Sequence, residues 1–119
     1  MTPDQILQTL KVYNAELESI LTRFTRNREG INIASKDNYR LRGLVTELLD
    51  LLKDHVPGSG QHMRLIANSY NDGISNWLSS SSYASVEEIR SVVGAVMTRI
   101  ERNPGLFTTA PAPIETGPN

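Results

Sequence analysis

The segment from Asn38 to Val56 has the strongest hydrophobic periodicity in the chain. Its apolar residues recur at steps of three and four, as they do along one face of an α-helix. They are Leu41, Leu44, Val45, Leu48, Leu49, Leu51, Leu52 and Val56. This apolar face is too wide for one neighbouring element to cover. The pattern therefore predicts a central helix over residues 37–56, capped by Ser35 or Asp37, with other helices packed on more than one side.

A first helix is predicted from residue 3 to residue 29. Thr2, Pro3 and Gln5 mark its start, because they supply a hydroxyl N-cap, a proline in the first turn and a glutamine that completes a capping box. Gly30 suits a C-terminal cap. Apolar residues follow at alternating steps of four and three: Ile6, Leu10, Tyr13, Leu17, Ile20 and Phe24. Such a seam also occurs in coiled coils, but it is short here and lacks an ordered charge code, which favours a bundle helix.

Two further helices complete the pattern, over residues 61–78 and 86–103. The third helix has Gly73 and several poor helix formers on its polar side, so a distortion is expected near Gly73. Ser85 and Glu88 have the spacing of a capping box at the start of the fourth helix. Residues 108–119 are rich in Pro, Thr and Gly and predict a disordered, flexible tail. The expected fold is an all-α, small four-helix bundle in residues 1–107, with a long N-terminal helix.

Composition narrows the class of protein. A chain of 119 residues with 39% hydrophobic residues can form one domain with its own core. The formal net charge of −1 argues against a general nucleic-acid coat protein, which needs a basic surplus. There is no cysteine, which fits a reducing compartment. No apolar segment is long enough to span a bilayer, so the chain is predicted to be cytoplasmic and without a membrane partner.

Residues that could support catalysis are few. The only histidines, His55 and His62, lack the spacing of a metal pair on one helix. Glu47, Asp50 and Asp54 share one face of the central helix, where they could hold Mg²⁺ or form a solvated acidic stripe. No second acidic pair with matching spacing accompanies them. The sequence therefore predicts no enzymatic activity, no metal and no cofactor.

Basic residues gather between the first and the central helix. Arg23, Arg26, Arg28, Lys36, Arg40 and Arg42 are half of the 12 Lys and Arg residues. With the helix N-terminus nearby they could bind an anion, and Tyr39 could stack on a base. The other interpretation is a solvated, cationic helix end. The candidate ligand-binding residues are Arg23, Arg26, Lys36, Tyr39, Arg40 and Arg42.

The third helix carries an unusual neutral polar stripe of Arg64, Asn68, Asn71 and Ser75. Amide side chains at these positions could form an interface with another subunit, or they could satisfy polar backbone groups inside the protein. The sequence leaves both interpretations open. The stripe is the candidate interface.

These patterns predict a protein that binds rather than catalyses. The expected function is that of a helical interaction module, a small accessory or adaptor subunit that forms a homo-oligomer or docks on a partner protein. The alternative is binding of a phosphate-bearing ligand, a nucleotide or nucleic acid, at the basic corner between the first two helices.

Overall fold

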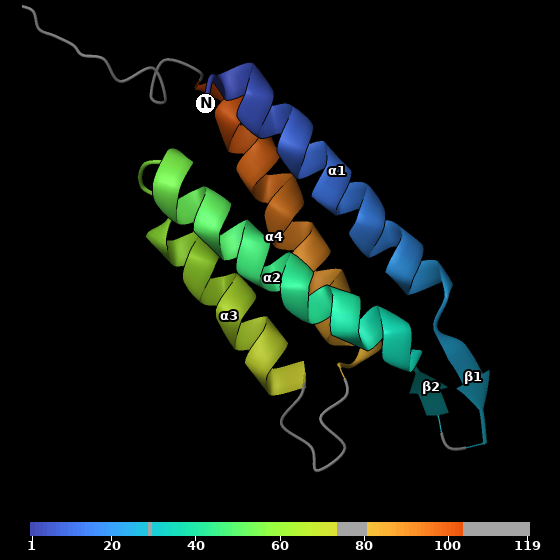
Figure 1. Ribbon diagram of the computed structural model, residues 1–119. Helices are drawn as coiled ribbons and strands as arrows, with labels where there is room; N and C mark the ends of the chain where they lie inside the picture. Colours follow the sequence, from blue (N-terminus) through green and yellow to red (C-terminus); the bar gives the residue numbers. More distant parts are fainter. Residues whose placement is uncertain (29, 74–80, 104–119) are drawn as a thin grey trace, which may run out of the picture.

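The protein is an all-α four-helix bundle with one short β-hairpin (Figure 1). The computed structural model describes residues 1–28, 30–73 and 81–103. Helix α1 (Pro3–Thr22) is followed by strands β1 (Thr25–Asn27) and β2 (Gly30–Asn32), and then by helices α2 (Ser35–His55), α3 (Gly60–Gly73) and α4 (Tyr83–Arg102). Helix α1 packs against α2 and α4, and α3 packs against the same two helices. Successive helices run in opposite directions, so that α1 begins and α4 ends at the same end of the bundle (Figure 1).

The core of the bundle consists of aliphatic side chains from all four helices. The buried residues are Ile6, Leu10, Leu17, Ile20, Leu41, Leu44, Val45, Leu48, Leu51, Leu52, Val56, Ile66, Val86, Ile89, Val92, Val93, Val96 and Ile100. The seam predicted for the first helix and the wide apolar face predicted for the central helix are both confirmed as core. Among the described residues, no helix is long and apolar enough to cross a membrane.

The start of α1 is confirmed, but its predicted end at residue 29 was wrong. Thr2 accepts a hydrogen bond from the backbone N–H of Gln5, and the Gln5 side chain accepts one from the backbone N–H of Thr2. The helix ends at Thr22, where the N–H of Arg23 donates to the carbonyl of Ile20. The chain then folds back as an antiparallel hairpin. The Arg23 side chain, just before the hairpin, binds Asp37 in the first turn of α2, just after the hairpin. This contact across the hairpin accounts for the end of α1 at Thr22.

Helix α2 begins two residues earlier than predicted, and its cap is not the predicted one. Ala34 is the N-cap, and it has no side-chain oxygen to accept a hydrogen bond. Ser35 lies inside the helix, and Asp37 is buried in the first turn. The Asp37 carboxylate binds Arg23 instead of the helix N-terminus. Arg23 donates to both oxygens of this carboxylate, and such a bidentate pair between two charged groups is among the strong hydrogen bonds of proteins.

A tight turn joins α2 to α3. Gly58 has a φ of 72°, a conformation that residues with a Cβ rarely adopt. The buried Ser59 hydroxyl donates to the carbonyl of Leu52, and Arg99 of α4 donates to the carbonyls of Pro57 and Gly58. The described part of α3 ends at Gly73, so the predicted distortion lies at the border of the described residues. Residues 74–78 of the predicted helix and the predicted tail, 108–119, lie outside them.

Helix α4 begins at Tyr83, three residues before its predicted start. Ser82 is the N-cap and accepts a hydrogen bond from the backbone N–H of Ser85. The predicted capping box of Ser85 and Glu88 was therefore wrong. Ser85 is buried, and its hydroxyl donates to the carbonyl of Ser69 on α3. This serine joins two helices, which a local sequence motif does not show.

Candidate functional site

A groove runs between α1 and α2 on the surface of the bundle. Two adjoining hollows form it, with volumes of about 370 and 450 Å³, and Arg40 lines both. The first hollow is lined by Lys36, Tyr39, Arg40 and Gly43 of α2. The second is lined by Val12, Ala15, Glu16, Ser19, Ile20, Arg23 and Arg40. We call these residues the α1/α2 groove.

The groove exists because short side chains face it. Ala15, Ser19 and Gly43 have too little volume to fill the space between the two helices. Two larger apolar side chains beside them remain in solvent, since Val12 is 51% exposed and Tyr39 is 74% exposed. Tyrosine is one of the residue types that are enriched in protein interfaces.

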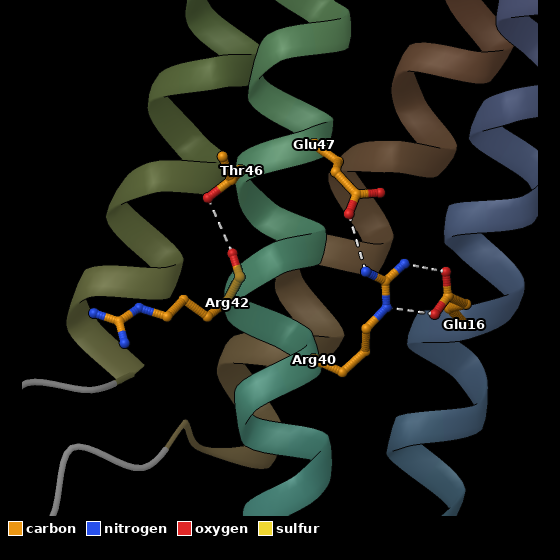
Figure 2. Close-up of polar contacts among 5 residues, drawn as sticks. All are labelled: Glu16, Arg40, Arg42, Thr46 and Glu47. Atoms are coloured by element: carbon orange, nitrogen blue, oxygen red, sulfur yellow. Dashed lines mark hydrogen bonds and ion pairs between the residues drawn. The ribbon is translucent and has the colours of Figure 1, made fainter.

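Arg40 bridges the two walls of the groove (Figure 2). Its Nε and Nη2 atoms donate to the two carboxylate oxygens of Glu16 on α1, at 2.8 and 2.6 Å. Its Nη1 atom donates to Glu47, about two turns further along α2, at 3.0 Å. The fork of the guanidinium is therefore held by two carboxylates. This arrangement leaves Arg40 little capacity to bind a further anion.

These contacts change the acidity of the groups involved. The hydrogen bond from Arg40 lowers the pKa of Glu16. The hydrogen bonds to Glu16 and Glu47 raise the pKa of Arg40. Burial raises the pKa of Tyr13, and the negative charge of Glu47 adds to this effect. All of these shifts keep the groups in their ordinary charge states at neutral pH, which is a structural role and not that of an acid or base in catalysis.

Arg23 forms a second ion pair at the hairpin end of the groove. Its Nε and Nη2 atoms donate to the two oxygens of Asp37, at 2.9 and 2.8 Å. The hydrogen bond from Arg23 lowers the pKa of Asp37. The Asp37 side chain is 9% exposed and that of Arg23 is 52% exposed. The pair thus joins the end of α1 to the start of α2 from the solvent side.

The structure brings some of the predicted ligand-binding residues together and separates others. Lys36, Tyr39 and Arg40 share one hollow, and Arg23 lines the adjoining one. Arg42 extends to the opposite side of α2 from Arg40 (Figure 2), and Arg26 is exposed on β1. The six residues therefore do not converge on one point.

The predicted interface stripe lies on α3, away from this groove. Arg64, Asn68 and Asn71 are all exposed. Ser75 lies outside the described residues. The three described positions of the stripe therefore lie on the surface of the bundle, and its use as an interface stays a prediction.

Sequence reasoning missed the α1 wall of the groove, formed by Val12, Ala15, Glu16 and Ser19. One signal was available: Val12 lies outside the apolar seam of the first helix, although it is a large hydrophobic residue. Gly43, in the middle of the central helix, was a second signal, because glycine disfavours helix and needs a reason to be there. Neither residue, however, shows in the sequence that the first and the central helix lie side by side at this point.

In the described part of the chain, no three His, Asp or Glu side chains are placed to hold a metal ion. The geometry there therefore gives no support for metal binding.

Comparison with known proteins identifies no family. The chain matches no protein-family model, no curated protein and no solved structure.

Proposed function

We propose that the protein is a non-enzymatic helical interaction module, a small accessory or adaptor subunit that acts through the α1/α2 groove. One observation carries the proposal: an open groove beside the well-packed core, bordered by the exposed side chains of Val12 and Tyr39. Tyrosine is enriched among the few residues that carry most of the binding energy in protein interfaces, and it does so when a partner covers it. The occupant is a second copy of the chain or a partner protein.

The alternative, a phosphate-bearing ligand, has less support. Lys36, Tyr39 and Arg40 do line one hollow, which suits a nucleotide in size and chemistry. However, Arg40 is held by Glu16 and Glu47, and a phosphate would have to displace both carboxylates. Titration with nucleotides and a short oligonucleotide separates the alternatives, since binding that Arg40→Ala weakens would favour the phosphate ligand.

Photo-crosslinking in the native cell tests the proposed function. With p-benzoylphenylalanine in place of Tyr39, we expect a discrete covalent adduct, because this side chain projects from the edge of the groove. The same group in place of Glu87, which is exposed on α4, is the matched control and should give no such adduct. Gly43→Leu should remove the adduct by filling the groove. A chain that gives no adduct at position 39, or equal adducts at both positions, would contradict the proposal.

A further inference from the structure

The exposed face of α2 contains two series of residues spaced by seven. One series is Lys36, Gly43 and Asp50, and the other is Arg40, Glu47 and Asp54. Seven residues make nearly two turns of an α-helix, so each series runs along the helix on one side. Gly43 and Arg40 line the groove, which places both series on the face that contains it.

This face has opposite charges at its two ends. The cations Lys36 and Arg40 lie toward the start of α2, and the carboxylates of Glu47, Asp50 and Asp54 lie toward its end. Arg40 and Glu47 bind each other. Among the described residues, Lys36, Asp50 and Asp54 take part in no salt bridge. Lys36 has a charged neighbour in Asp37, whose pKa it helps to lower, but Asp37 is bound by Arg23. Charges of opposite sign that are held in no salt bridge among the described residues therefore remain at the two ends of the face.

The middle of the face is open to close approach. A Cβ added at Gly43 would meet only Arg40 Nη1 at 3.6 Å and Glu47 Oε2 at 4.0 Å, which are ordinary contact distances. Because Gly43 has no side chain, the backbone of a second helix can approach α2 closely at this position. The exposed side chains of Val12 and Ala15 of α1 line the adjoining hollow. A second helix could therefore lie across α2 at Gly43.

We propose that the groove is occupied by a second copy of this chain, with the two α2 helices antiparallel and a two-fold axis near Gly43. Lys36 and Asp50 are both seven residues from Gly43. A two-fold axis at Gly43 therefore sets Lys36 of each copy opposite Asp50 of the other copy. A parallel arrangement would set like charges against each other at both ends. The small formal net charge of −1 adds little general repulsion between copies. This inference rests on the proposed function, and it identifies the partner of that same groove.

Charge exchange tests the orientation. Lys36→Glu and Asp50→Lys each place two like-charge contacts in the symmetric dimer, so each should raise its dissociation constant by roughly ten- to a hundredfold. An equimolar mixture of the two variants should restore association, because every contact in the mixed dimer then joins opposite charges. The double variant should also dimerise. Sedimentation velocity and light scattering, from micromolar to roughly millimolar protein, give the masses.

Two matched variants control for charge and position. Arg42→Glu reverses a cation on the opposite side of α2, and Glu88→Lys reverses an exposed carboxylate on α4. Both should leave the dimer as tight as in the parent.

Gly43→Leu tests the position of the axis. It should abolish dimerisation, since the added side chain projects into the open groove, while circular dichroism shows the helical content of the parent.

Three results would overturn the inference. They are a parent protein that stays monomeric over the whole concentration range, a dimer that both charge reversals leave intact, and single variants that do not associate when mixed. The first result, together with a position-39 adduct that contains a different polypeptide, would leave the proposed function standing. An absence of adducts would remove the proposed function as well.

Discussion

At the scale of single residues, several arginines of this protein join its helices through ion pairs. Arg23 binds Asp37 across the end of α1 and the start of α2, and Arg40 binds Glu16 across the groove. Ion pairs on a protein surface contribute little free energy, but a forked arginine on a mostly buried carboxylate contributes more because of its geometry and reduced hydration. The buried Asp37 is therefore the carboxylate whose loss should matter most.

Asp37→Asn should lower the melting temperature at pH 7 by roughly 5 °C, because the charge-assisted hydrogen bonds to Arg23 are lost while the shape of the side chain is kept. The pKa of Asp37 is lowered in the folded state. Its stabilising effect is thus present above the pKa of an unfolded aspartate, about 4, and is lost as the pH falls through the lower folded value. Thermal melts of parent and variant should converge below pH 4. Glu88→Gln, at an exposed carboxylate on α4 away from the groove, is the control and should have little effect at either pH.

At the scale of elements, the three glycines Gly43, Gly58 and Gly94 have different roles. Gly58 requires its left-handed conformation, and a Cβ there would lie 2.7 Å from Arg99 Nη2. Gly94 lies inside α4, and nothing lies within 4 Å of the position that a Cβ would occupy. Gly43 is inside α2 and borders the groove. Of these three glycines, only Gly43 has a position related to the proposed binding site.

Gly94→Ala should raise the free energy of unfolding by about 0.5–1 kcal/mol, because alanine favours helix and the added methyl group meets no neighbour. Gly58→Ala should lower it, since the turn would be strained and Arg99 displaced. Urea denaturation of the two variants measures both effects. A destabilised Gly94→Ala variant would show that the space beside this residue is needed for packing.

At the scale of the whole molecule, the described residues of all four helices form one shared core in the bundle. Its buried side chains lie between Ile6 and Ile100, and α4 ends at Arg102 beside the start of α1 (Figure 1). Each helix covers the apolar faces of its two neighbours.

A chain shortened to residues 1–107 should therefore keep the helical circular dichroism and the melting temperature of the parent, with one cooperative transition. A clear loss of stability would mean that residues after 107 contribute to the fold. Thermal melts of the two chains under identical conditions, at a protein concentration where both have the same mass, make this comparison.

The sequence by itself determined the helices and most of their core. Aliphatic residues at steps of three and four predict an amphipathic helix wherever the chain places them. The capping box at Thr2 is equally local, because its two hydrogen bonds join residues only three positions apart. The all-α bundle follows from these local rules. The charges near the start of the central helix were visible, but their partners were not.

Only the tertiary structure decided where α1 ends, which charges pair and where the surface is open. Arg23 and Asp37, Arg40 and Glu16, and Ser85 and Ser69 are each separated by many residues, so their contacts depend on how the helices pack. The end of α1 at Thr22 depends on such contacts and not on helix propensity. The groove likewise exists because the short side chains of Ala15 and Ser19 on one helix lie beside Gly43 on another. Periodicity describes each helix alone, whereas a site between two helices is a property of the pair.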